Sequence, residues 1–243
     1  MSSKPKQQDT PTEYKDKDIK IPNIYLYYAN IMDYFRVIAA MIAFAIAKHH
    51  PIMFVVLYWI SFILDAFDGT VARARNEKSK LGATLDMVTD RISTAGLLCI
   101  ISQFYPSIST FFVFMIMLDV GSHWLQTNSS LLKNVHNDNH KNLDEKFWLL
   151  NLYYKNRTVL GVFCVGAEVF LLLLYIMHFY EWLYMYILFK LLLWTGCVIY
   201  LGKQYISILQ ILGATDRIVQ FDIQEAIDAQ TKKKYFSTNT KHT

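Results

Sequence analysis

Long apolar runs, separated by short polar segments, dominate this chain. Six of them are long enough for a membrane-spanning helix, which needs about 20 residues. The runs cover residues 24–47, 51–72, 83–104, 107–127, 157–178 and 182–202. In a soluble domain, amphipathic periodicity would interrupt such runs. The pattern therefore predicts an all-α integral membrane protein with six transmembrane helices in one domain, residues 23–214, between polar tails at 1–22 and 215–243.

The composition agrees with this prediction. Of the 243 residues, 53% are apolar and 18% are charged, whereas a soluble domain carries about 25% charged residues. A chain this rich in apolar residues is also excluded from the disordered class.

Lysine and arginine are unevenly distributed between the polar segments. Of the 24 basic residues, 20 lie in the N-terminal tail, in the segments 73–80 and 128–157, or after residue 202. The connections on the opposite side of the membrane contain only Lys48. By the positive-inside rule, both tails and both basic segments face the cytoplasm. An even number of transmembrane helices follows from this arrangement.

Four aspartates lie at or near the ends of two consecutive predicted helices. A carboxylate near the bilayer centre costs about 2.5–3.5 kcal/mol, so such residues are usually functional. Asp65 and Asp68 are three residues apart, and Asp86 and Asp90 are four apart. Each pair therefore shares one helix face. Because a short cytoplasmic connection joins the two helices, we expect the four carboxylates to converge at the cytoplasmic side.

Converging carboxylates repel one another unless cations intervene. Two divalent ions would supply four positive charges, and ligands that are all oxygen favour Mg²⁺ or Mn²⁺ over Zn²⁺. We therefore expect two such ions at this site, where they can polarise a phosphate. The alternative is a solvated loop in which each acid pairs with a nearby arginine or lysine, but four acids at helical spacing disfavour it.

Small residues accompany the acids. Gly69 and Ala72 follow the first pair and Gly82 precedes the second, and small side chains let a ligand or a neighbouring helix approach the backbone. We count Ala72 and Gly82 among the candidate pocket residues. Arg73 can hold a phosphate through two parallel hydrogen bonds. Taken alone, the glycines could equally serve packing or turns, and Arg73 could be an interfacial anchor.

Together these positions form one pattern: Asp65-x2-Asp68-Gly69-x2-Ala72-Arg73-x8-Gly82-x3-Asp86-x3-Asp90. It resembles the signature of the CDP-alcohol phosphatidyltransferase family, and all eight fixed positions are met. The surrounding residues, the segment 118–124 and the region around Tyr153, Tyr154 and Arg157 resemble the eukaryotic branch that uses inositol. The resemblance covers nearly the whole membrane region and neither tail.

The resemblance implies a six-helix membrane enzyme of the CDP-alcohol phosphatidyltransferase fold, a homodimer in the endoplasmic reticulum with a cytoplasmic active site. Such enzymes transfer the phosphatidyl group of CDP-diacylglycerol to an alcohol, here myo-inositol, and release CMP. Matched position by position, the four aspartates would bind two metal ions, and Asp90 would also be the general base. Gly69, Arg73 and Ser79 match positions that contact CDP-diacylglycerol; Ser79 replaces a common threonine and keeps its hydroxyl. The partners are these substrates and membrane lipid, with no nucleic acid.

Further polar residues are candidates for the substrate pocket. Asp119, Ser122 and His123 share one helical face, where they can line an inositol pocket or form an interhelical hydrogen-bond cluster. Arg157, at the start of the fifth run, can bind substrate or serve as an interfacial anchor. Glu168 lies in the middle of that run, where an ionisable group is expensive and thus a functional candidate, although it could also be protonated and hydrogen-bonded.

Asn30 and Arg36 resemble an element near the start of the family's first helix, with Ala29 in place of its proline. The alternative for Arg36 is a long side chain that reaches from the helix start toward the interface. Asp33 can pair with Arg36 at i,i+3 and be purely structural.

Two other functions fit part of the pattern. The same chemistry could use serine, glycerol phosphate or another alcohol, because the eight fixed positions do not define the acceptor. A divalent-cation channel or transporter would distribute its acids through the membrane depth. Here four acids cluster at one face beside glycines and basic residues, which favours a phosphate site.

Overall fold

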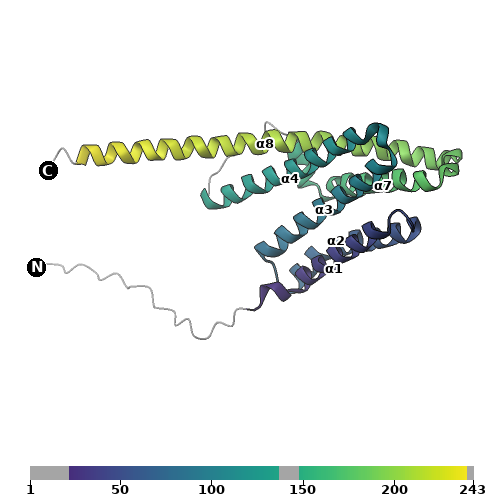
Figure 1. The fold of residues 1–243 in the computed structure, drawn as a ribbon. Helices are drawn as coiled ribbons and strands as arrows, with labels where there is room; N and C mark the ends of the chain where they lie inside the picture. Colours follow the sequence, from purple (N-terminus) through teal and green to yellow (C-terminus); the bar gives the residue numbers. More distant parts are fainter. Residues whose placement is uncertain (1–21, 137–147, 240–243) are drawn as a thin grey trace, which may run out of the picture.

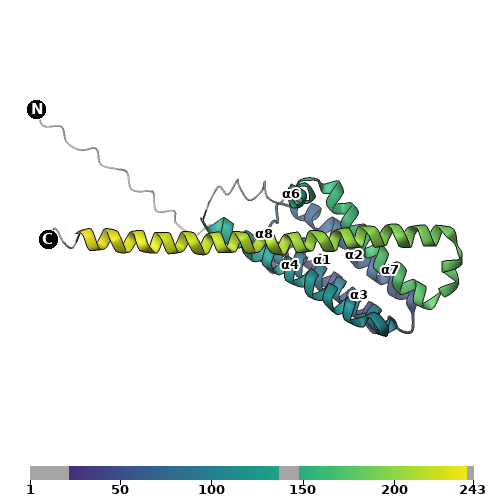
Figure 2. The same cartoon turned by 90° about the horizontal axis from the view of Figure 1, so that it is seen from above.

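The computed structural model describes residues 22–136 and 148–239, and every regular element in these two ranges is a helix (Figure 1, Figure 2). The all-α prediction is therefore confirmed. Almost all of the predicted N-terminal tail lies outside the described residues. The elements in chain order are η1 (Ile24–Leu26), α1 (Tyr28–Ile46), α2 (Pro51–Ala74), α3 (Lys80–Phe104), η2 (Pro106–Ile108), α4 (Ser109–His136), α6 (Trp148–Lys155), α7 (Arg157–Phe179), η3 (Glu181–Met185) and α8 (Ile187–Asn239).

Local sequence sets several helix boundaries. Pro51 opens α2 at a position where its missing N–H costs nothing. The Ser79 side chain caps α3 by accepting from the backbone N–H of Gly82 at 2.9 Å. Asn76, between α2 and α3, has a φ of 56°, a left-handed conformation that asparagine tolerates better than most residues. These features make a tight, defined turn between the two helices that carry the four aspartates.

Five stretches are long and apolar enough to span a membrane: α1, α2, the stretch Pro106–Leu132, α7 and the stretch Ile187–Lys233 of α8. Large apolar side chains such as Phe35, Met41 and Val198 are exposed along them, as expected for lipid-facing surfaces. The remaining predicted span corresponds to α3, which has 25 residues but carries acids and bases in its first half. Composition thus supports five spans, and the predicted count of six is not confirmed.

Helix α3 contacts helices from both halves of the chain. Helices α1 and α2 form an antiparallel hairpin, α3 packs against α1, α4 and α7, and α8 packs along α4 and α7 (Figure 1). A buried cluster that includes Phe54, Leu97, Leu98, Leu171 and Tyr175 joins α2, α3 and α7. Toward one end, the start of α1, the end of α2 and the start of α3 come together, and this end carries the polar residues.

Helix α8 continues far beyond the predicted span that ended at residue 202. It runs unbroken to Asn239 and projects beyond the other helices (Figure 1, Figure 2). The segment 203–239 contains no proline and one glycine, so nothing in it interrupts a helix. The predicted boundary between the membrane domain and the C-terminal tail therefore falls inside one continuous helix.

Candidate functional site

The four predicted aspartates lie together at the junction of α2 and α3. Their carboxylates form two overlapping groups, each with ligand atoms within 4.8 Å of one another. One group is Asp65, Asp86 and Asp90, and the other is Asp68, Asp86 and Asp33 of α1. Asp86 belongs to both groups. Two triads that share one carboxylate are a suitable arrangement for two neighbouring cations, because the shared side chain can contact both.

Arg36 of α1 lies at the centre of this cluster, and its side chain is 3% exposed. Its two terminal nitrogens form ion pairs with five carboxylates: Nη1 with Asp33 (2.8 Å), Asp68 (2.9 Å) and Asp86 (3.2 Å), and Nη2 with Asp90 (2.6 Å) and Asp65. One guanidinium cannot neutralise five carboxylates, and the excess negative charge favours further cations. An all-oxygen ligand set fits hard divalent ions such as Mg²⁺ and Mn²⁺.

A cavity of about 280 Å³ opens on one side of the cluster. We call it the glycine-side cavity; its lining includes Asn30, Asp33, Asp68, Gly69, Ala72, Arg73, Ser79, Gly82 and Asp86. Five of the residues predicted to contact a substrate therefore share one surface. The Arg73 side chain is exposed, and Nη2 donates to the Thr70 hydroxyl at 3.0 Å. Arg73 forms no ion pair with any described residue, so its charge is available to an anion.

Gly82 allows α3 to approach α1 closely. A Cβ at this position would lie 2.7 Å from Oδ1 of Asn30 and 3.2 Å from Oγ of Ser79, distances that no side chain tolerates without a shift of its neighbours. Asn30 is 1% exposed, and its Nδ2 donates to the carbonyl of Ile24 at 2.6 Å. Gly82 thus allows close helix packing at the rim of the cavity. Packing was the alternative that the sequence offered to a role in a ligand pocket.

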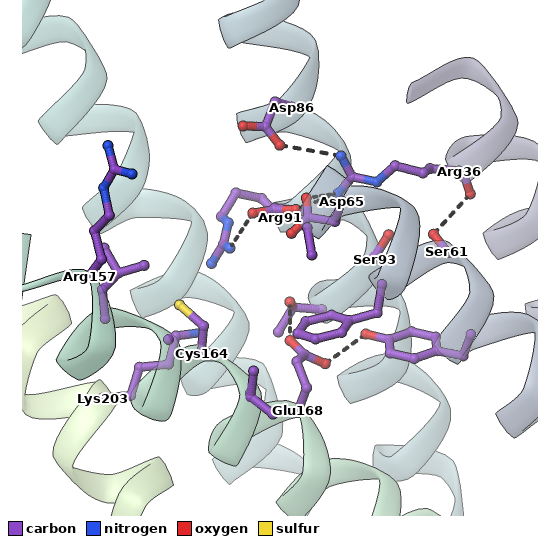
Figure 3. Close-up of a pocket in the computed structure, with 18 residues that line it drawn as sticks. Arg36, Ser61, Asp65, Asp86, Arg91, Ser93, Arg157, Cys164, Glu168 and Lys203 are labelled. Carbon is purple, nitrogen blue, oxygen red and sulfur yellow. Dashed lines mark hydrogen bonds and ion pairs between the residues drawn. The ribbon is translucent and has the colours of Figure 1, made fainter. Parts of the chain in front are cut away.

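A second cavity, of about 520 Å³, lies on the other side of the cluster. We call it the α7-side cavity; its lining includes Arg36, Tyr58, Asp65, Asp86, Asp90, Arg91, Thr94, Arg157, Cys164, Glu168 and Lys203. In Figure 3, Asp65 and Asp86 lie on one side of it, Arg157 and Lys203 form another wall, and Glu168 lies opposite Asp86. Asp86 and Asp90 border this cavity, and Asp86 borders both. The carboxylate cluster thus lies between two cavities, and charged side chains line part of each.

A buried ion-pair network supports the wall of the α7-side cavity. Nη1 of Arg91 lies 2.9 Å from both carboxylate oxygens of Asp119, and Nζ of Lys203 lies 3.3 Å from one of them. Arg91 also contacts Asp90, because its Nη2 lies 3.3 Å from Oδ2 of that residue. Asp119 is 2% exposed. One carboxylate of α4 therefore pairs with two cations that reach the cavity from α3 and α8, and Asp90 is a second acidic partner of Arg91.

Asp119, Ser122 and His123 are close together, as predicted, but they line neither of the two cavities described. The Ser122 hydroxyl donates to the Asp119 carbonyl at 3.0 Å, and Nδ1 of His123 lies 2.8 Å from the same carbonyl. They lie behind Arg91 and Lys203, so the structure favours the interhelical cluster over direct contact with a substrate. Arg157, by contrast, lines the α7-side cavity with an exposed side chain.

Sequence reasoning missed several residues of the site. Asp33 pairs with Arg36, the structural role that its i,i+3 spacing allowed, and it also joins one of the carboxylate groups. Arg91 lies inside the predicted span 83–104 and Lys203 directly follows the span 182–202, and neither was predicted to belong to the site. A basic residue in or next to a long apolar run does not indicate where in space its side chain points.

The fold and the site define an all-helical membrane protein. Its acidic cluster, which lies between two cavities, is suited to binding divalent cations and phosphate. The sequence profile of the CDP-alcohol phosphatidyltransferase family matches residues 26–202. The chain belongs to this family, and the predicted resemblance is confirmed. Members of the family are generally dependent on divalent metal ions, and the buried acidic groups are suitable ligands.

Similar proteins occur in fungi, plants and mammals. The CDP-diacylglycerol–inositol 3-phosphatidyltransferase of Candida albicans is 35% identical over 85% of this chain and 88% of its own length. The human protein of the same name is 37% identical over 87% of this chain and 98% of its own length. A probable CDP-diacylglycerol–inositol 3-phosphatidyltransferase 2 from Arabidopsis thaliana is 40% identical over 84% and 94%. No solved structure matched the chain.

Proposed function

We propose that this protein transfers the phosphatidyl group of CDP-diacylglycerol to myo-inositol and releases CMP. The names of its relatives in three kingdoms support this acceptor. The observation that carries the proposal is Asp86, which belongs to both carboxylate groups and borders both cavities. A transferase for two substrates needs a reaction centre that both can reach, and the cluster around Asp86 has this position.

The glycine-side cavity suits the nucleotide part of CDP-diacylglycerol. Arg73 presents a planar guanidinium that can hold a phosphate through two hydrogen bonds. Gly69 leaves backbone close to the cavity uncovered, and a Cβ there would lie 3.3 Å from Nη1 of Arg73. The Ser79 hydroxyl caps α3 and faces the same space. These three residues are our candidates for contacts to the CDP-lipid, whose acyl chains would remain in the bilayer.

Asp65, Asp68, Asp86 and Asp90 would hold two ions, Mg²⁺ or Mn²⁺, and Asp33 is a further member of the group that contains Asp68. When bound, such ions neutralise charge on the phosphoanhydride and on the departing CMP. Arg36 forms ion pairs with all of these carboxylates. It keeps the acids together and would give up some of these bonds when metal ions bind.

Asp90 is our candidate general base. A hydroxyl is a poor nucleophile until its proton is removed, and Asp90 borders the α7-side cavity, where the acceptor would lie. The inositol oxygen forms a bond to the phosphorus that carries the diacylglycerol, the phosphoanhydride bond to CMP breaks, and Asp90 takes the proton. An in-line reaction needs the attacking and leaving groups on opposite sides of phosphorus, which two cavities flanking one cluster can provide. Arg91, 3.3 Å from Asp90, would orient the base.

The location of the protein is part of the proposal. Both termini and the acidic cluster would lie on the cytoplasmic side of the membrane, and the distribution of basic residues supports this orientation. Residence in the endoplasmic reticulum and a homodimeric assembly are carried over from the family resemblance.

Release of CMP from CDP-diacylglycerol tests the function. The purified protein is reconstituted in lipid vesicles and given myo-inositol, serine, glycerol 3-phosphate or no acceptor, each with Mg²⁺, with Mn²⁺ or with a chelator. We expect release only with myo-inositol and a divalent ion, and complete loss with the chelator, reversed by added metal. Release with another alcohol and none with inositol would contradict the proposal, as would full activity in chelator.

A further inference from the structure

Glu168 is a buried acid to which the proposed reaction assigns no role. It lies within the apolar helix α7 and is 6% exposed. Its Oε2 accepts from the Tyr58 hydroxyl at 2.8 Å, and its Oε1 accepts from the Thr94 hydroxyl at 2.7 Å. Among the described residues it forms no ion pair. An acid within a membrane-spanning helix costs free energy. A neutral side chain could fill a purely structural role equally well, so the acid at this position favours a functional role.

Glu168, Tyr58 and Thr94 all line the α7-side cavity. In Figure 3, Glu168 lies across the cavity from Asp86, with Asp65 and Arg91 between them. Thr94 follows Asp90 by four residues on α3, which corresponds to about 6 Å along a helix axis. The cavity therefore has the proposed base near one end and Glu168 about one helical turn further in.

The chemistry of Glu168 favours a ligand that donates hydrogen bonds. An ionised carboxylate has about four acceptor positions, and Tyr58 and Thr94 occupy two. The remaining positions can accept from hydroxyl groups in the cavity. A metal site at Glu168 is disfavoured, because this residue belongs to neither of the two carboxylate groups found among the described residues.

The charges around the cavity favour an uncharged ligand. Four cations (Arg36, Arg91, Arg157 and Lys203) and four carboxylates (Asp65, Asp86, Asp90 and Glu168) line this cavity. Because the two signs of charge balance, an acceptor with a net charge of either sign gains no net attraction there. A neutral molecule with several hydroxyls satisfies all of these groups.

We propose that Glu168 determines acceptor specificity by accepting a hydrogen bond from a hydroxyl of a neutral ring polyol, on the side of the ring away from the reacting hydroxyl. This proposal rests on the proposed function and names how its acceptor is selected. The distance between hydroxyl oxygens on opposite carbons of a six-membered ring is similar to the rise of one helical turn, about 5.4 Å. With one hydroxyl at Asp90, another reaches Glu168, whereas a short acceptor such as serine reaches only one of the two. The site would then bind the acceptor rather than the CDP-lipid.

The test compares Glu168→Gln with the wild-type protein in the CMP-release assay. The substitution keeps the size of the side chain and removes its charge. We expect KM for myo-inositol to rise about 10- to 100-fold, the range for losing a hydrogen bond to a charged group, while KM for CDP-diacylglycerol stays within about twofold of its wild-type value. Glu181→Gln, at an exposed glutamate of η3, is the matched control and should change neither constant.

Deoxy analogues of inositol supply a measurement that needs no variant. With wild-type protein, removal of one hydroxyl other than the reacting one should reduce kcat/KM about 10- to 100-fold. In Glu168→Gln the same analogue should lose little more, because the partner of that hydroxyl has already been removed. A merely structural glutamate would lower the thermal midpoint of unfolding and leave the ranking of the analogues unchanged.

The outcomes separate the two proposals. If the wild-type protein releases no CMP with inositol, the proposed function fails. If it uses inositol, yet Glu168→Gln keeps the wild-type KM for inositol and the wild-type ranking of deoxy analogues, the role of Glu168 is overturned while the function stands. If the variant does not fold, equal activity of the wild-type protein on all the deoxy analogues that keep the reacting hydroxyl would overturn the proposal.

Discussion

The two cavities differ in where along the chain their residues come from. The glycine-side cavity is lined mainly by one continuous stretch, from Asp68 to Asp86, that folds into the end of α2, a tight turn and the start of α3. The α7-side cavity instead collects side chains from α1, α2, α3, α7 and α8. The first can be assembled by local helix geometry, whereas the second exists only when distant helices pack. We therefore expect substitutions on the two sides to affect different substrates.

The largest effect is expected at the boundary between the cavities. Asp90→Asn removes the proposed base and keeps the size of the side chain. A positioned general base contributes about 10²- to 10⁴-fold in rate, so kcat for CMP release should fall by at least about 100-fold. The control is Asp222→Asn, at an exposed aspartate of α8. Turnover of Asp90→Asn close to that of the control would remove Asp90 from the role of base.

The next effect concerns the wall of the α7-side cavity. Asp119→Asn removes the buried acidic partner of Lys203 and one of the two acidic partners of Arg91, which keeps Asp90. Breaking a buried ion pair by removing one partner costs about 3–5 kcal/mol, so the thermal midpoint of unfolding in detergent should fall clearly. Adding Lys203→Met to this variant removes the charge that lost its partner and should recover part of the loss. An unchanged midpoint in the single variant would show that this network does not stabilise the fold.

The same contrast explains how much could be predicted from the sequence. Asp65, Asp68, Asp86 and Asp90 were predictable as a cluster, because three- and four-residue spacings put each pair on one helix face and the connection between the helices is short. Lys203 and Arg91 were not, because their positions depend on how α8 and α3 pack against α4. The place of Asp33 in the cluster was not predictable either, since a local pairing with Arg36 at i,i+3 could explain this residue without a distant partner.

Fold prediction shows the same division. The apolar runs predicted each long helix of the membrane region, because length and composition alone define such helices. Hydropathy did not predict the extension of α8 to Asn239, since a polar helix and a polar tail have the same composition. The charges of α3 that create the site also keep it from being counted as a span by composition.

A smaller and more selective effect is expected in the glycine-side cavity. Arg73→Lys keeps the charge but loses the planar pair of donors that suits a phosphate. We expect KM for CDP-diacylglycerol to rise about tenfold and KM for inositol to stay the same, the reverse of the pattern for Glu168→Gln. Arg75→Lys is the matched control, because Arg75 stacks on the Tyr28 ring at 3.7 Å and does not line the cavity. Equal effects on both substrates would contradict the division of the site into two sides.

The smallest expected effect is at Ser79, which belongs both to the helix cap and to the glycine-side cavity. Ser79→Ala removes the acceptor for the Gly82 N–H, and losing such a cap costs about 1 kcal/mol. The thermal midpoint should therefore fall slightly, and KM for CDP-diacylglycerol should rise without a change in KM for inositol. Ser79→Thr keeps a hydroxyl at the same position and should preserve both properties. If the threonine variant instead behaves like the alanine variant, the hydroxyl is not the group that matters, and the position serves the cavity by its small size.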